Sequence, residues 1–152
     1  MEIEINYTEP NNIIGSTVQT KITTINKRQT FVFLFPQIVE ITRTEFKDFR
    51  KTINDLKNLI TYGRFDYSFE AFNFYAKSND EMKLISCYYE FSYRQITNNR
   101  NLKNANYNLE YLSKIFNQLS SKHSILLVFE NDKPLLIMQK ELTFAIAPMV
   151  ID

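Results

Sequence analysis

Few residues of the chain belong to the types that do covalent or metal chemistry. The sequence has one cysteine, Cys87, in the apolar run LISCYYEF, and one histidine, His123, among Ser and Lys in an expected turn. Neither has a neighbour that would activate a nucleophile, and the two together are too few for a His- or Cys-rich metal site. The two glycines, Gly15 and Gly63, stand alone, which excludes a Gly-rich phosphate-binding loop. We therefore expect no enzyme activity, no metal and no cofactor.

Basic residues on an expected helix form a pattern that suits a binding function. Lys47, Arg50, Lys51 and Lys57 fall together at 3.6 residues per turn, with Asp48 and Asp55 placed toward the apolar boundary. Such a stripe is typical of a surface that contacts phosphates and holds DNA without reading its sequence. A solvated helix face gives the same pattern, and the helix taken alone favours that simpler interpretation.

Apolar spacing predicts the two helices that carry these residues. Residues at steps of three and four line one face of the first helix, which opens at Thr44-Glu45: Phe46, Phe49, Ile53, Leu56 and Ile60. Gly63 follows its last turn, where a C-terminal cap is usual. Leu109, Leu112, Phe116 and Leu119 predict a second helix. Its outer face, with Lys114, is only mildly basic.

Strands are expected before, between and after the two helices. Alternating residues predict a β-hairpin of Glu2–Tyr7 and Thr17–Ile25. The apolar segment Thr30–Val39 predicts one strand with Pro36 at an edge or a bulge. The remaining expected strands are 65–70, 72–76, Met82–Tyr93, Ser124–Glu130, Pro134–Gln139 and Leu142–Ile146. The stretch Gln95–Asn106 is rich in Asn, Arg and Lys and is expected to be an exposed loop. The order suits an α+β fold with antiparallel sheets and two helices on one face, and we find no internal sequence repeat.

Length and composition are those of a globular protein inside the cell. At 152 residues the chain fits a single large core, and it is 44% hydrophobic and 23% charged. One cysteine is typical of a reducing compartment. No apolar run approaches the roughly 18 residues that a membrane span needs, so we expect no membrane partner. The formal net charge of +1 does not by itself indicate a nucleic-acid partner.

Several local motifs resemble the sliding clamps of the proliferating cell nuclear antigen type. EFKDFRKTINDL at Glu45–Leu56 is similar to the first helix of the second clamp domain, and NLEYLSKIFNQLS at Asn108–Ser120 is similar to the second helix. KPLLIMQ at Lys133–Gln139 resembles a clamp strand that begins Pro-Leu. FAIAPMVID at Phe144–Asp152 resembles the aromatic-rich last strand running into Ala-Pro and an acidic end. This last motif is the most specific.

The resemblance extends to the N-terminal segment and implies a domain organisation. Residues Ile3–Ile25 resemble the last two strands of the first clamp domain, and NKRQT at Asn26–Thr30 stands where the interdomain connector lies. The resemblance therefore implies a clamp (processivity) fold in two parts. Residues 1–28 would be the hairpin and connector that end the first domain, and residues 29–152 the clamp C-terminal domain.

The same resemblance implies three surfaces. The DNA-facing wall would carry Lys47, Arg50, Lys51, Lys57 and Lys114. A pocket for the clamp-binding peptides of partner proteins would be lined by Ile25, Ile38, Pro134, Ala145, Ala147, Pro148 and Val150. A subunit interface between strand edges would include Thr20, Ile22, Thr24, Ile85, Cys87 and Tyr89.

The implied function is that of a non-enzymatic DNA polymerase processivity factor. Such a protein encircles duplex DNA, binds it independently of sequence, and recruits DNA polymerase and other replication or repair proteins. It would self-associate or assemble with a second clamp chain, in the nucleus or at viral or cytoplasmic replication sites. The alternative is a clamp-fold adaptor, or a transcription or checkpoint factor, that binds a protein partner without forming a ring around DNA.

Overall fold

The computed structural model describes residues 2–11, 23–68, 71–78, 82 and 85–150. The chain divides into two compact units, residues 1–34 and residues 35–152. The domain boundary expected between residues 28 and 29 falls inside a strand, six residues before the division between the units.

The first unit is a two-stranded antiparallel ribbon. Strands β1 (Glu2–Asn11) and β2 (Thr23–Val32) pair in register from Glu2 opposite Val32 to Asn11 opposite Thr23. A hairpin was predicted, but residues 26–30, expected as a connector, belong to β2 and pair with residues 4–8 of β1. Their polarity was misleading because backbone groups, not side chains, form the ladder.

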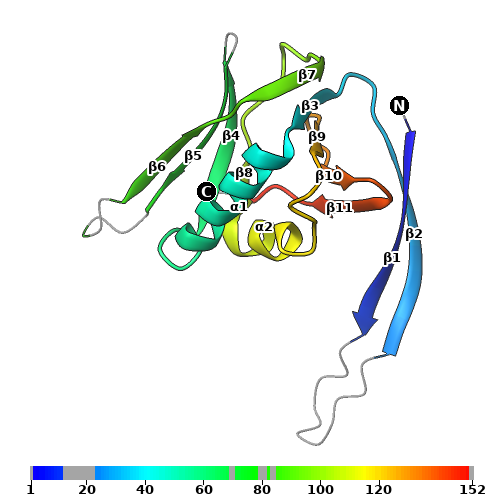
Figure 1. The fold of residues 1–152 in the computed structure, drawn as a ribbon. Helices are drawn as coiled ribbons and strands as arrows, with labels where there is room; N and C mark the ends of the chain where they lie inside the picture. Colours follow the sequence, from blue (N-terminus) through cyan, green and yellow to red (C-terminus); the bar gives the residue numbers. More distant parts are fainter. Residues whose placement is uncertain (1, 12–22, 69–70, 79–81, 83–84, 151–152) are drawn as a thin grey trace, which may run out of the picture. The chain divides into compact units, whose positions relative to one another are not determined.

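The second unit holds two antiparallel sheets and two helices, which confirms the α+β class (Figure 1). The helices are α1 (Arg43–Leu56) and α2 (Leu109–Phe116). The five-stranded sheet has the order β11-β10-β9-β3-β7 and the four-stranded sheet the order β6-β5-β4-β8. The strand bounds are β3 Gln37–Ile41, β4 Tyr62–Ser68, β5 Ala71–Lys77, β6 Ser86–Glu90, β7 Tyr93–Thr97, β8 Asn106–Asn108, β9 Ile125–Phe129, β10 Leu135–Gln139 and β11 Leu142–Ile146.

The two sheets are built by two topologically equivalent halves that exchange their first strands. One half runs β3-α1-β4-β5-β6 and the other runs β8-α2-β9-β10-β11. Strand β3 of the first half pairs with β9 of the second, and β8 of the second pairs with β4 of the first. The order of elements is therefore repeated within the second unit, although the sequence shows no repeat of residue types.

The strand expected over residues 30–39 is wrong, because the chain bends between β2 and β3. Pro36 has no N–H to give to a ladder. The carbonyl oxygens of the bend instead accept from side chains: the Asn99 amide donates to Phe35 O at 2.7 Å, and the Thr97 hydroxyl donates to Pro36 O at 2.7 Å. Both donor residues are brought to the bend because β7, which ends at Thr97, pairs with β3.

The strand expected over Met82–Tyr93 is divided between the two sheets. Strand β6 pairs with β5, whereas β7 pairs with β3 in the other sheet. At the crossing, Phe91 turns its ring into the core and its N–H donates to Phe72 O at 2.9 Å. The first residues of the expected loop, 95–97, therefore belong to β7.

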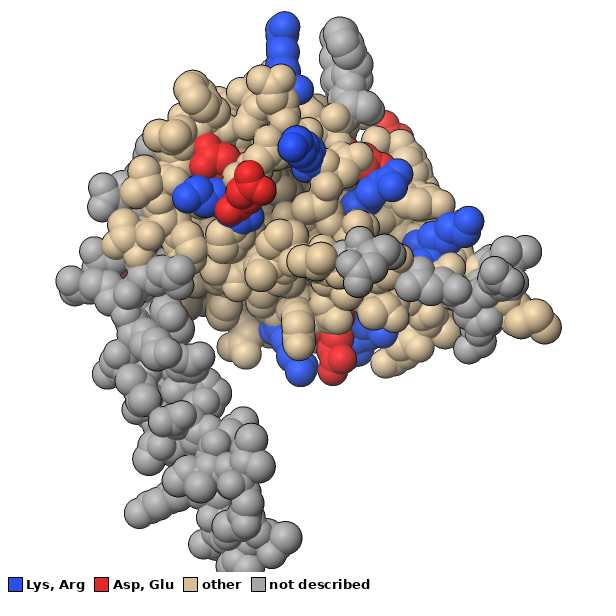
Figure 2. Space-filling model, turned by 180° about the vertical axis from the view of Figure 1, so that it is seen from behind, with Lys and Arg blue, Asp and Glu red and all other residues tan. Residues whose placement is uncertain are grey.

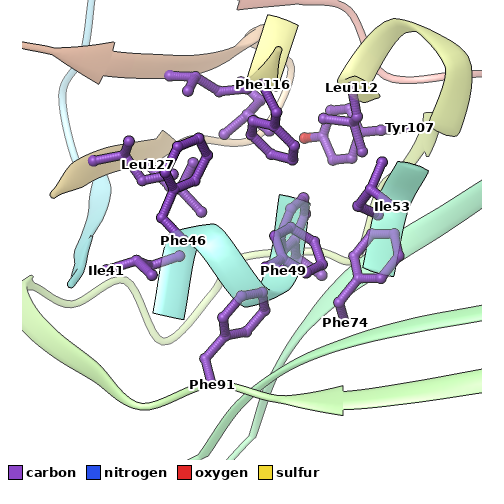
Figure 3. Packing of buried hydrophobic residues seen from close by; sticks show 14 of the residues in the cluster. Ile41, Phe46, Phe49, Ile53, Phe74, Phe91, Tyr107, Leu112, Phe116 and Leu127 are labelled. Carbon is purple, nitrogen blue, oxygen red and sulfur yellow. The ribbon is translucent and has the colours of Figure 1, made fainter. Parts of the chain in front are cut away.

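Apolar faces of both helices and the inner faces of both sheets form one core. Phe49 of α1 is fully buried at its centre, with rings from α2, β4 and β5 around it (Figure 3). Its ring centroid lies 4.7 Å from that of Phe91 and 5.5 Å from that of Phe116, in edge-to-face arrangements that aromatic pairs prefer. The helical periodicity of the sequence is thus confirmed for both helices.

The end of the first helix differs from the prediction. Helix α1 begins after Thr42, whose hydroxyl accepts from Glu45 N at 3.4 Å, and it ends at Leu56. Ile60 is buried beyond the helix, and Gly63 lies in β4 opposite Ala76 and Tyr107 instead of capping the helix.

Candidate nucleic-acid interface

The two helices lie side by side and are joined by a polar network. The Asn54 amide of α1 donates to Asn117 Oδ1 at 3.0 Å, and the Ser113 hydroxyl of α2 donates to Asn54 Oδ1 at 2.5 Å. Below it, the Phe46 and Phe116 rings meet edge to face with centroids 5.6 Å apart. This packing sets the two helices at fixed positions, so that their outward side chains form one continuous surface.

Three of the predicted basic residues are solvent-exposed on or directly after α1. Lys47 and Lys51 lie on the exposed face of the helix, and Lys57 follows its last turn. None of the three has an ion-pair partner among the residues that the structure describes. Their ammonium groups are therefore the first candidates for contact with an external anion.

Arg50 has a structural contact that the sequence did not indicate. Its Nη1 donates to Leu119 O at 3.0 Å, and its guanidinium carbon lies 5.4 Å from the centroid of the Phe46 ring. The side chain is half-buried and ties α1 to the turn after α2. Arg50 contributes positive charge to the surface but has fewer free donors than the lysines.

Acidic side chains interrupt the basic surface. Asp48 and Asp55 were expected near the apolar boundary, yet both are exposed, because a step of 100° per residue turns them well away from Phe46 and Phe49. On α2, Lys114 lies 3.6 Å from Glu110 and 5.8 Å from the Tyr111 ring centroid. The helix surface is therefore moderately positive, with Lys114 partly neutralised.

Among the described residues, charges of one sign form no large area on the face that is turned away from the viewer in Figure 1. Figure 2 shows Lys and Arg side chains scattered among uncharged ones, with Asp or Glu beside several of them, on the face turned away from the viewer in Figure 1.

The predicted pocket residues gather in part along the last strand. Ala145 is exposed on β11, opposite Leu136 of β10. Pro134 precedes β10 and Ala147 follows β11, and these ends are adjacent because Leu135 pairs with Ile146. Pro148 and Val150 continue the chain, exposed, with Val150 at 92%.

The other two pocket residues are not brought to this group. Ile38 lies in β3, which β9 and β10 separate from β11 in the same sheet, and is 8% exposed. Ile25 lies in β2 of the first unit, opposite Glu9, where only its backbone is described. The structure thus assembles Pro134, Ala145 and the residues after β11 without Ile25 or Ile38.

The predicted interface residues fall on two separate strands. Strand β6 is the outermost strand of its sheet, with β5 on one side. Cys87 and Tyr89 alternate toward the core, and the Tyr89 ring lies 5.2 Å from Phe49, so Ser86, Tyr88 and Glu90 face away. Ile85, directly before β6, packs against the core.

The remaining interface residues belong to the first unit. Thr24 pairs with Pro10 in the β1–β2 ladder, and Thr20 and Ile22 lie outside the described residues.

Burial raises the pKa of the Cys87 thiol, which keeps it protonated at neutral pH and agrees with a packing role.

The sequence did not indicate the contacts that join the helices. Neither Asn54 nor Ser113 was predicted to make a contact between the helices, although Ser113 is 1% exposed. A serine four residues after the apolar Leu109 on α2 is a signal for such a contact, but its partner lies 59 residues away in the sequence.

Neither metal-binding nor membrane-spanning features are found in the described part of the chain. No group of three His, Cys, Asp or Glu side chains there is placed to hold a metal ion, and no helix there is both long and apolar enough to cross a membrane. Comparison of the sequence with known protein families and with curated proteins found no match.

Proposed function

We propose that the chain is a sliding-clamp-like DNA processivity factor. The observation that carries the proposal is the pair of helices joined by Asn54, Ser113 and Asn117, with Lys47, Lys51 and Lys57 exposed on it. A helical surface whose lysines have no ion-pair partner among the described residues is suited to hold phosphates without reading bases.

The arrangement of elements supports the proposal. The order strand, helix, strands, helix, strands, which the clamp resemblance implies, is the order of β3 to β11 in the second unit. The exchange of first strands between the two halves places α1 and α2 side by side and gives the unit two sheets. Both features agree with one clamp domain.

Weak, water-screened contacts suit sliding. Lysine side chains are flexible point charges, so they can follow successive phosphates without a fixed register. Asp48, Asp55 and Glu110 lower the net charge of the surface, which limits the free energy of each contact. A protein that slides along DNA needs contacts that are individually weak. It also needs a closed ring around the duplex, which prevents its dissociation from the DNA.

Closure requires further chains. We propose that β6, an outer strand, pairs with a strand of a second copy or of a second clamp chain, since its free backbone edge offers ladder groups. Partner proteins such as a DNA polymerase would dock their clamp-binding peptides beside Pro134, Ala145, Ala147, Pro148 and Val150. The protein itself catalyses nothing in this proposal.

Duplex binding at several salt concentrations tests the DNA-facing surface. The variant Lys47→Ala/Lys51→Ala removes two free ammonium groups, so the slope of log K against log salt should become shallower by about two. Fluorescence anisotropy with a labelled duplex measures the slope. The matched control is Lys103→Ala/Lys133→Ala, which removes the same charge from loops elsewhere in the second unit.

Two outcomes would reject the surface. If both double variants change the slope equally, DNA binds to net charge and not to the helices. If neither changes it, the helices are a solvated face, and the adaptor alternative, which needs no DNA contact, is favoured.

A further inference from the structure

The last described residues of the chain connect the two sheets of the second unit. Strand β11 is an outer strand of the five-stranded sheet and ends at Ile146, and β8 is an outer strand of the four-stranded sheet. After β11 the chain runs toward β8 (Figure 1), where Met149 forms an isolated antiparallel bridge with Asn106 and its N–H donates to Asn106 O at 2.7 Å. Residues 147–150, which we call the strap, therefore tie an outer strand of one sheet to an outer strand of the other.

The strap borders a cavity of about 220 Å³ between the sheets. Pro148 is the one residue of the strap that lines this cavity, and Ala105 and Tyr107 on its wall flank Asn106, to which the strap is bonded. A movement of the strap would therefore change the access to the cavity. The remaining lining comes from β4, β5, residues 102–104 and residues 129–133.

A single backbone hydrogen bond holds the strap to β8. Pro148 has no N–H to donate, and Ala147 and Val150 make no hydrogen bond or ion pair with any described residue. Both are exposed, Val150 at 92%, and the Met149 side chain is only half-buried. Segments with so few buried contacts open locally, at a much smaller free-energy cost than global unfolding.

The two ends between which the strap runs are held more firmly. Ile146 is 5% exposed and pairs with the fully buried Leu135 of β10. Asn106 pairs with Arg64 of β4 in the ladder of the other sheet. Breaking the bond from the strap to β8 therefore leaves both ladders intact, so the motion is confined to the residues after Ile146.

We propose that the strap is a conformational switch, which opens when the Met149–Asn106 bond breaks while both sheets stay folded. In the closed form Pro148 stands at the wall of the cavity. In the open form the cavity is more accessible on this side, and the outer edge of β8 is free.

The opening itself does not depend on the function proposed above, but a role in peptide docking does. Ala147, Pro148 and Val150 belong to the proposed peptide pocket, and the strap presents Ala147 and Val150 to solvent when it is closed. A peptide that binds the closed form alone would hold the strap on β8, because a ligand stabilises the state to which it binds.

Hydrogen exchange of backbone amides in the full chain, followed by NMR at a series of low urea concentrations, tests the opening. The Met149 amide should exchange more slowly than an unprotected amide, because its bond is formed most of the time. It should exchange about 100-fold or more faster than the amide of Leu127 in the central strand β9. Low urea should leave the Met149 rate unchanged, since a local opening exposes little surface.

Two proline variants test whether the bond controls access to the cavity. Met149→Pro removes the donor, and Val150→Pro is the matched control, because the Val150 N–H has no partner among the described residues. The reporter is Ala105→Cys in a Cys87→Ser background, which places a single thiol on the cavity wall beside the strap. Met149→Pro should speed modification of this thiol by a water-soluble disulfide reagent about fivefold or more, the effect of one net hydrogen bond on an equilibrium constant. Val150→Pro should leave the rate unchanged, and thermal melting verifies the fold of both variants.

Three results would overturn the proposal. If the Met149 amide exchanges as slowly as that of Leu127, the strap opens only when the protein unfolds. If it exchanges at the rate of an unprotected amide, the bond to β8 is not formed in solution. If both proline variants speed thiol modification equally, the bond does not control access. These results are independent of duplex binding, because no residue of the strap lies on α1 or α2.

Discussion

At the scale of single residues, Gly63 shows how a close contact decides a residue type. An added Cβ at Gly63 would lie 2.3 Å from Cζ of Phe74 and 3.0 Å from Tyr75 O. We predict that Gly63→Ala lowers the free energy of unfolding by about 1–3 kcal/mol, the range for overpacked sites. Urea denaturation measures the loss.

The partner of that contact provides the control. In a Phe74→Leu background the ring is gone, so the alanine should cost less than in the native background. An equal cost in both backgrounds would contradict a clash with the Phe74 ring and point to the contact with Tyr75 O of β5.

The buried tyrosines predict a pH dependence of stability. The pKa values of Tyr67 and Tyr107 rise from 10 to about 12, with burial as the main cause. Between pH 10 and 12 the unfolded chain releases these protons while the folded chain keeps them, so the free energy of unfolding falls as pH rises. Denaturation at a series of pH values should show the decline, and Tyr107→Phe should make it shallower. A slope unchanged by this variant would argue against the burial of Tyr107.

Residue-level predictions from the sequence succeeded where the helix pattern alone decided them. The helical spacing of 3.6 residues per turn predicted that Phe46, Phe49 and Ile53 are buried and that Lys47 and Lys51 are exposed, as in the structure. It failed for Arg50, because the carbonyl that binds its guanidinium lies 69 residues away. It also misplaced Gly63, since the ring that excludes a side chain comes from a neighbouring strand.

At the scale of elements, α2 depends on its N-terminal cap. Helix α2 has eight residues, and the Asn108 side chain accepts from Tyr111 N at 3.0 Å. We predict that Asn108→Ala lowers the free energy of unfolding by about 1 kcal/mol, whereas Asn108→Asp keeps most of it, because a carboxylate also caps a helix. Thermal melting of both variants compares the two. Equal losses would mean that the pairing of β8 with β4, and not the cap, requires asparagine.

Strands were less predictable than helices because their partners lie far along the chain. The last three strands, expected at Ser124–Glu130, Pro134–Gln139 and Leu142–Ile146, were predicted to within one residue of their observed bounds. Strand β7 was not predicted, because its residues are mostly polar and its partner β3 lies far away in the sequence. The bend at Pro36 has the same origin, since Thr97 and Asn99 satisfy its carbonyl groups.

At the scale of the whole molecule, the exchanged halves explain why two short helices occupy one surface. Strands β3 and β8 each precede a helix and each cross to the other half's sheet. The repeat was invisible in the sequence because equivalent positions carry different side chains. Only the order of elements is repeated.

The candidate surfaces were predicted unevenly for the same reason. The lysines of α1 follow from one helix, so the sequence placed them. The residues beside β11 come together through the β10–β11 ladder, whereas Ile38 is separated from β11 by β9 and β10. The residues around the cavity between the sheets come from β4, β5, residues 102–107, residues 129–133 and Pro148, so no local pattern predicts it.

Encirclement of DNA is the central claim, and retention on closed and open DNA tests it most directly. The protein, alone or with a candidate chain supplying the rest of a clamp, is bound to closed circular duplex at low salt, and the salt is then raised. We predict that protein stays on the circle and is lost once a restriction enzyme linearises it, because a ring slides off free ends. Equal loss from circular and linear DNA at each salt concentration would contradict encirclement.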